Sequence, residues 1–139
     1  MKITDAGMHP YPAGDSTIAR MALEAGELGF DSVVVIGDAV CQPSGIEVLR
    51  GAVIGATSIK EVLKKVRDPA VRRADVIYVD AGDVAFNRAA VSIKEVNVVR
   101  GIHAARRNAF DHVAARTAAE QGVAVDISMA PIIHFRGTK

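Results

Sequence analysis

Runs of β-branched apolar residues alternate along the chain with segments in which apolar residues recur every three or four positions. A continuous apolar run is typical of a strand that is buried on both faces of a parallel sheet. The predicted strands are residues 2–8, 32–37, 47–53, 75–80, 96–100 and 123–128. Because helical segments separate strands at this spacing, the pattern predicts parallel β/α units.

Four helices are expected between the strands, each identified by an apolar stripe and residues typical of helix ends. The first helix is expected from Asp15 or Ser16 to Gly29 and the second from Ser58 to Asp68. The third is expected from Phe86 to about Val91 and the fourth from Asn108 to Gly122. Leu28 is expected on the buried face of the first helix. Ser58 and Glu61 form a capping box, and Asn108 is expected to cap the last helix, with Asp111 in its first turn.

The order of elements predicts an α/β fold of repeated β/α units, as in a TIM barrel. A dinucleotide-binding sheet is less favoured, because no Gly-x-Gly-x-x-Gly follows the first strand. A closed barrel needs eight units and typically about 200 residues or more, whereas five or six units are visible here. We therefore expect residues 1–139 to form a single β/α barrel domain that is open or lacks its C-terminal closing units.

Composition and charge narrow the classes of partner. Half of the 139 residues are hydrophobic and 4% are aromatic, which argues against rows of rings that stack single-stranded bases. The net charge is +1, yet residues 84–116 carry six basic and two acidic side chains, whereas residues 1–40 carry two basic and six acidic ones. This asymmetry predicts a local positive surface. The sequence contains no apolar run of membrane-spanning length, so we expect a soluble, cytoplasmic protein that does not contact a membrane.

The loop after the fifth predicted strand holds the strongest candidate for a binding site. Functional side chains of β/α barrels lie at the carboxyl ends of the strands. Here Arg100 and His103 leave a strand, and Arg106, Arg107 and Asn108 lead into a helix. The start of a helix favours an anion, and the arginines add forked donors for phosphate oxygens. The simpler alternative is a solvated loop with surface arginines.

A metal site is the competing hypothesis. Acidic and histidine residues at or near the predicted strand ends resemble the ligands of barrel metallohydrolases: Asp5, His9, Asp38, Asp80, His103 and Asp126. The first strand lacks the His-x-His of such sites, and helix caps or turns explain the same aspartates more simply. The single cysteine, Cys41, excludes an internal disulfide and has no signature of a catalytic nucleophile around it.

Several segments together resemble the archaeal ribonuclease P protein component 3 family, whose eukaryotic relatives are the thirty-kilodalton subunits of the nuclear enzyme. The segments are Gly14–Thr17, Leu28–Val35, Gly82–Val91, Asn97–Val99, Phe110–Arg116 and Val123–Ser128. The resemblance extends over nearly the whole chain, although family members normally continue well beyond residue 139. The chain departs from the family pattern at Arg100–His103, which lacks a frequent His-Pro, and at Ala109, where a glycine is frequent.

The resemblance implies a subunit of the enzyme that removes the 5′ leader from precursor tRNA. In that family the RNA is the catalyst, and the protein is a barrel related to the PHP phosphoesterases that has lost their full set of metal ligands. It implies no catalytic residue, no metal and no cofactor held by this chain, with Mg²⁺ serving the RNA-catalysed reaction. The implied partners are ribonuclease P RNA, protein component 2 and the other protein components.

The basic segment of residues 84–116 and the family resemblance indicate the same RNA-binding residues. The predicted set is Arg88, Arg100, His103, Arg106, Arg107, Asn108, His112 and Arg116. For Arg88 and Arg116, a helix-surface charge or a structural ion pair is an equally good interpretation. Two other functions stay open at this point: a stand-alone metal-dependent phosphoesterase of the PHP or amidohydrolase-like barrel type, and a barrel scaffold for protein assembly.

Overall fold

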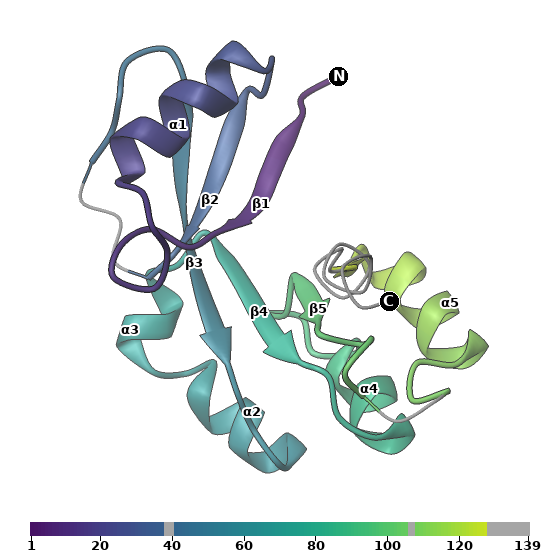
Figure 1. Ribbon diagram of the computed structural model, residues 1–139. Helices are drawn as coiled ribbons and strands as arrows, with labels where there is room; N and C mark the ends of the chain where they lie inside the picture. The colour runs from purple at the N-terminus through teal and green to yellow at the C-terminus, as the bar shows by residue number, and fades with distance from the viewer. Residues whose placement is uncertain (38–40, 106–107, 128–139) are drawn as a thin grey trace, which may run out of the picture. The chain divides into compact units, whose positions relative to one another are not determined.

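The computed structural model describes residues 1–37, 41–105 and 108–127. Strands and helices alternate along most of them, except that β3 follows β2 and α3 follows α2 (Figure 1). The elements are β1 (Thr4–Met8), α1 (Ile18–Glu27), β2 (Ser32–Ile36), β3 (Glu47–Ile54), α2 (Ile59–Lys65), α3 (Pro69–Arg72), β4 (Val76–Asp80), α4 (Val84–Ala90), β5 (Val98–Arg100), α5 (His112–Gln121) and β6 (Ala124–Val125). Hydrogen bonds join the strands in chain order, and the pairs β1–β2, β2–β3, β4–β5 and β5–β6 are parallel. The predicted α/β class with parallel β/α units is confirmed.

The chain forms two compact units, each built from two stretches of sequence. Unit 1 comprises Met1–Val53 and Arg67–Ile77, and unit 2 comprises Ile54–Val66 and Tyr78–Lys139. Each unit has its own strands and at least one helix that buries apolar residues. The expectation of one barrel domain over residues 1–139 stays a prediction.

Unit 1 is centred on β2. Ser32, Val33, Val34 and Val35 are all buried, as expected for a strand covered on both faces. Helix α1 packs against this strand, and the cluster between them consists of Ala22, Ala25, Val33, Val35 and Ile46. The side chains of Thr4 on β1 and Ser32 on β2 share a hydrogen bond of 2.6 Å, which fixes the register of the two strands at their start.

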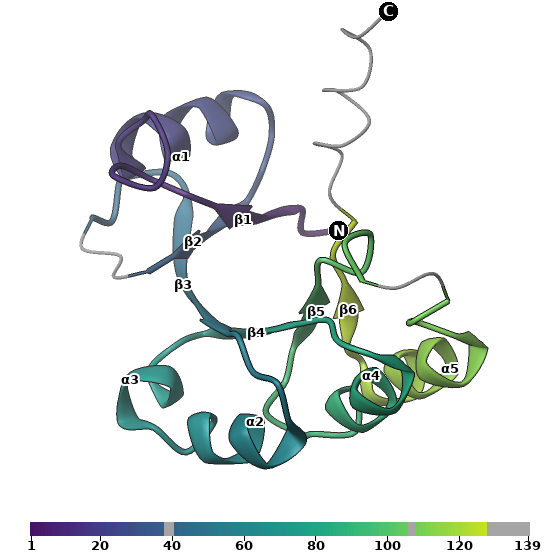
Figure 2. The same cartoon turned by 60° about the horizontal axis from the view of Figure 1, so that its bottom comes forward.

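Unit 2 contains β5, β6 and most of β4, with three helices that bury small or β-branched residues. Val79 on β4 and Val99 on β5 are fully buried and face each other in register. Figure 2 shows α4 between α2 and α5, and α4 contacts both. The fully buried side chains on these helices include Val62, Ala90 and Ala114. This arrangement fixes which helix faces of unit 2 remain open to solvent.

The last helix begins three residues later than the sequence suggested. We expected Asn108 as its cap, but Asp111 holds that position and its carboxylate accepts a hydrogen bond of 3.0 Å from the Ala114 N–H. Asn108 instead adopts a left-handed backbone with φ 65° in the preceding turn, a conformation that asparagine tolerates better than most residues. Both residues suit either position, so composition alone could not separate them.

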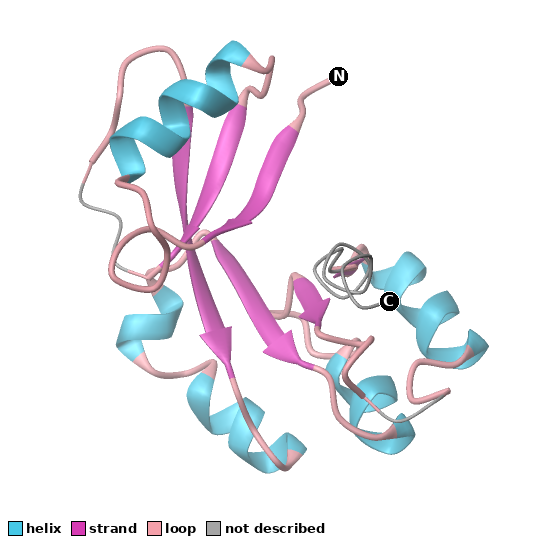
Figure 3. Cartoon of the chain, viewed as in Figure 1, coloured by secondary structure: helices cyan, strands magenta, loops and turns pink. Residues whose placement is uncertain are grey.

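Other differences concern helix starts and short elements (Figure 3). Thr17, rather than Asp15 or Ser16, caps α1, and its hydroxyl accepts from the Arg20 N–H at 3.3 Å. Leu28 was expected on the buried face, but it follows the last helical residue and is 78% exposed. Asp68-Pro69 was expected to end the second helix, but α2 ends at Lys65 with Val66 as its C-cap. Asp68-Pro69 instead starts the unpredicted α3, because proline suits the first helical position.

The helices are short. Among the described helices, α1 and α5 are the longest, with ten residues each. Over residues 1–37, 41–105 and 108–127, no helix has both the length and the apolar character needed to cross a membrane.

Candidate nucleic-acid interface

The carboxyl ends of β4 and β5 in unit 2 are joined by an ion pair. Asp80 and Arg100 are the last residues of these strands and are partners in the parallel register. The Arg100 Nε donates to the Asp80 Oδ1 at 2.7 Å, with the arginine side chain 29% exposed and the aspartate 45% exposed. The Ala81 N–H continues the ladder by donating to the Arg100 carbonyl at 2.9 Å. The pair therefore aligns the two strand ends where barrel proteins carry functional groups.

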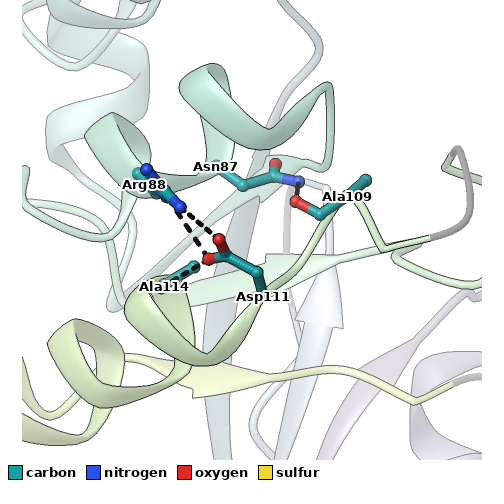
Figure 4. Close-up of polar contacts among 5 residues, drawn as sticks. All are labelled: Asn87, Arg88, Ala109, Asp111 and Ala114. Carbon is teal, nitrogen blue, oxygen red and sulfur yellow. Dashed lines mark hydrogen bonds and ion pairs between the residues drawn. The ribbon is translucent and has the colours of Figure 1, made fainter.

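A buried asparagine connects the loops that follow these strands (Figure 4). The Asn87 side chain on α4 is fully buried. Its amide oxygen accepts from the Gly82 N–H at 2.8 Å, and its amide nitrogen donates to the carbonyls of Gly82 at 3.1 Å and Ala109 at 2.8 Å. One amide thus satisfies buried polar groups of the β4–α4 loop and of the segment before α5. This amide fixes the C-terminal end of the loop that begins at Arg100.

Gly82 is required by close packing in the same loop. A Cβ at this position would lie 2.9 Å from the Phe86 ring, and Phe86 is itself 8% exposed. Asp83 follows and caps α4, its carboxylate accepting from the Phe86 N–H at 2.8 Å. The sequence Gly82-Asp83 therefore gives the chain a tight turn followed by the start of α4. This turn places the Asn87 side chain within hydrogen-bond distance of Gly82.

Arg88 and Asp111 link α4 to the start of α5. The Arg88 Nε donates to the Asp111 Oδ1 at 3.3 Å, and its Nη2 contacts Oδ2. The Arg88 guanidinium, followed by the hydrogen bond from the Ala114 N–H, lowers the pKa of Asp111 to about 2. The same carboxylate raises the pKa of Arg88. Asp111 therefore caps α5 and holds the neighbouring helix with one side chain.

The predicted RNA-binding residues fall into two groups. Arg100 is the last residue of β5, His103 lies exposed in the loop that follows, and Asn108 lies exposed further along the same connection. His112 and Arg116 lie one turn apart on the exposed face of α5, next to the Arg88–Asp111 pair. Arg106 and Arg107 lie outside the described residues. The assignment of all eight residues to RNA stays a prediction.

The arginines predicted to bind RNA differ in whether they form an ion pair within the chain. Arg88 and Arg100 each neutralise an aspartate, as the alternative interpretation of Arg88 anticipated. Arg116, by contrast, is exposed and has no acidic partner in the part of the chain that the structure describes. Unpaired cations release more counterions on contact with phosphate than paired ones do. The structure therefore gives Arg88 and Arg100 a structural role in addition to the predicted one.

Sequence reasoning missed Asn87 and the second role of Asp111. Nothing in the pattern separates a buried asparagine on a short helix from an exposed one, because the decisive partner, Ala109, is 22 residues away. Asp111 carries a stronger signal. It stands three positions before Ala114, the start of the buried stripe of α5, which is the spacing of an N-cap to its first bonded amide.

One acidic strand-end residue of the metal hypothesis, Asp80, has another partner, and so does the nearby Asp83. Asp80 pairs with Arg100, and Asp83 caps α4. Across the described ranges, no three His, Cys, Asp or Glu side chains gather as metal ligands would. Asp38 lies outside those ranges.

A family model described as RNase P subunit p30 matches residues 2–139. The chain belongs to the RNase P subunit p30 family. Among curated proteins, this p30-family chain is 31% identical to ribonuclease P protein component 3 of Methanothermobacter thermautotrophicus, covering 86% of this chain and 54% of the relative. It is 31% identical to the component 3 of Natronomonas pharaonis, covering 96% and 58%. The chain thus spans little more than half the length of these relatives.

Solved structures share the fold of this p30-family chain. A chain in the cryo-EM structure of archaeal ribonuclease P with mature tRNA superposes with a TM-score of 0.68 at 19% identity, covering 94% of this chain and 59% of that one. A crystal structure from Coccidioides immitis, described as a deoxyribose-phosphate aldolase, gives a TM-score of 0.52 at 20% identity, with coverage of 88% and 56%. These matches confirm the predicted TIM-barrel-like class of fold.

Replacing Asn87 by aspartate tests the buried amide. Asn87→Asp keeps the shape but places carboxyl oxygens against the Gly82 and Ala109 carbonyls, so we expect unfolding free energy at neutral pH to fall by about 3 kcal/mol. Asn108→Asp is the matched control, because this exposed position should change by less than about 0.5 kcal/mol. Urea unfolding measures both. Equal losses for the two variants would contradict a structural role specific to Asn87.

The Arg88–Asp111 pair predicts an acid-sensitive component of stability. Because the pKa of Asp111 is lowered to about 2 in the folded chain, its contribution is present above the unfolded value near 4 and is lost as pH falls towards 2. Asp111→Asn retains a helix cap but removes this component. Urea midpoints between pH 4 and pH 2 should therefore decline less steeply in Asp111→Asn and in Arg88→Gln than in the wild type. Three parallel curves would exclude the pair as the source.

Proposed function

We propose that this chain acts as a protein subunit of ribonuclease P, binding the catalytic RNA and supporting removal of the 5′ leader from precursor tRNA. The observation that carries the proposal is the family match over residues 2–139. Protein component 2 and the other protein components are the proposed partners, and the cytoplasm is the proposed location. Mg²⁺ is assigned to the RNA-catalysed reaction, with no metal held by this chain.

The described side chains suit binding to a polyanion. Several exposed cations of unit 2 have no acidic partner within the described ranges: Lys60, Lys64, Lys94 and Arg116. Such charges can neutralise phosphates without first breaking an internal ion pair. Phosphate contacts of this kind position a folded RNA and do not read its sequence. The described charges therefore suit a subunit that holds RNA while the RNA performs the chemistry.

A stand-alone metal-dependent phosphoesterase is not favoured by the geometry. That reaction requires several oxygen or nitrogen ligands converging on one point. The acidic residues at the ends of β4 and at the start of α4 and α5 instead hold Arg100 or backbone N–H groups: Asp80, Asp83 and Asp111. Their roles are accounted for by structure.

Arg106 and Arg107 provide the test of RNA binding by the loop. Replacing both by alanine should weaken binding to ribonuclease P RNA and reduce the slope of log affinity against log salt by about 1.5, since each lost phosphate contact removes roughly 0.7 to 0.9 from it. Filter binding of the wild-type chain and the variant at several salt concentrations measures the slope.

The matched control is the other Arg-Arg pair, Arg72 and Arg73, both exposed at the end of α3 in unit 1. Arg72→Ala with Arg73→Ala makes the same change in net charge and should retain the wild-type slope. If the two double variants lose equal amounts, net charge explains the result and the loop is not the contact. If the wild-type chain fails to bind the RNA at all, the proposed function is wrong.

A further inference from the structure

Each of the three helices described in unit 2 places a cation midway between two buried residues. The three sets are Lys64 between Val62 and Val66, Arg88 between Phe86 and Ala90, and Arg116 between Ala114 and Ala118. A residue two positions from a buried one is turned about 200° around the helix axis. The three cations therefore occupy equivalent positions, each opposite the face that its helix buries.

The helices that carry these cations are neighbours. Helix α4 contacts both α2 and α5, and the two ribbon views agree on this order (Figure 2). Lys64 and Arg116 are exposed, and the Arg88 side chain is 47% exposed. Lys64, Arg88 and Arg116 thus form a series across three adjacent outer helix faces, which we call the outer cation row. Lys60 and His112 lie one turn before its two end members and are also exposed.

The charges around the row leave it positive. Glu61 on α2 pairs with Lys65, and Asp111 pairs with Arg88. Glu120, one turn beyond Arg116 on α5, is exposed and forms no ion pair with it. Lys64 and Arg116 therefore contribute net charge, whereas Arg88 is held in place by its carboxylate. A guanidinium has five N–H donors, so the bonds to Asp111 leave Arg88 donors for a second acceptor.

Helix α1 of unit 1 also carries a cation at this kind of position, because Arg20 lies midway between the half-buried Ile18 and the buried Ala22. It differs in that this cation is paired within its own helix. On α1, Arg20 pairs with Glu24 at 2.9 Å, and the exposed outer residues also include Glu27 and Leu23. The outer face of α1 therefore carries no unpaired cation, whereas the outer faces of α2 and α5 carry Lys64 and Arg116.

We propose that the outer cation row is a phosphate-binding surface for folded RNA, separate from the loop after β5. The proposal rests on the proposed function and adds Lys64 to the residues that contact RNA. Packed helices lie about 10 Å apart, so the row spans roughly 20 Å across three helices. That length fits the backbone of a folded RNA segment and exceeds a single nucleotide. Contacts to phosphates alone make this surface sensitive to RNA shape and salt, and indifferent to base identity.

A charge-neutralising double variant tests the row. Lys64→Gln with Arg116→Gln should reduce the salt slope of binding to ribonuclease P RNA by about 1.5 and lower affinity at moderate salt by about tenfold or more. Lys2→Gln with Arg20→Gln is the control, since it removes two exposed cations from unit 1. The conservative swap Lys64→Arg with Arg116→Lys should restore the wild-type slope.

The results of these binding experiments distinguish failure of the outer cation row from failure of the proposed function. An unchanged slope in the Lys64/Arg116 variant, with wild-type RNA binding intact, overturns the row and leaves the proposed function standing. Equal losses in the Lys2/Arg20 control also overturn it, because net charge alone would then act. Absence of RNA binding by the wild-type chain overturns both. If the double variant unfolds, Lys64→Gln alone should show half the change in slope, and no change there overturns the row.

Discussion

Parallel strands cannot be joined by tight turns, so each neighbouring pair needs a longer crossover. In unit 2 these crossovers contain helices that bury one face. In unit 2 the buried positions of α2, α4 and α5 recur every four residues and include Val62, Ala90 and Ala114. The position midway between two buried residues must then face solvent. The helical period that places apolar residues in the core therefore also sets the exposed positions, where a charged side chain stays solvated. Lys64 and Arg116 occupy such positions.

The ion pairs of unit 2 divide its cations by role. Arg100 aligns two strand ends through Asp80, and Arg88 connects two helices through Asp111. Each pair is locally neutral, so its contribution to attraction of a polyanion is small compared with its contribution to geometry. The buried amide of Asn87 acts in the same region by holding the segment before α5. Long-range attraction of a polyanion would therefore come mainly from the unpaired cations, which the helices hold at fixed spacing.

The fold could be predicted from the sequence because its signals are local. The apolar run at Ser32–Val35 is buried on both faces as expected, and the Ser58 cap of α2 is confirmed. Helix boundaries do not follow from composition, since Asn108 and Asp111 are both good caps and only the turn geometry distinguishes them. The contacts of Asn87 depend on residues far apart in sequence, and no periodic pattern reports them. The resemblance over residues 82–128 identified the family, which the family model confirms.

Cleavage of precursor tRNA by a reconstituted complex tests the central claim most directly. The assay combines ribonuclease P RNA, Mg²⁺, the other protein components and this chain, and omits one component at a time. The account predicts that omission of the RNA abolishes removal of the 5′ leader, and that omission of this chain slows it. Cleavage by the RNA-free polypeptide, or an unchanged rate without the polypeptide, would contradict it.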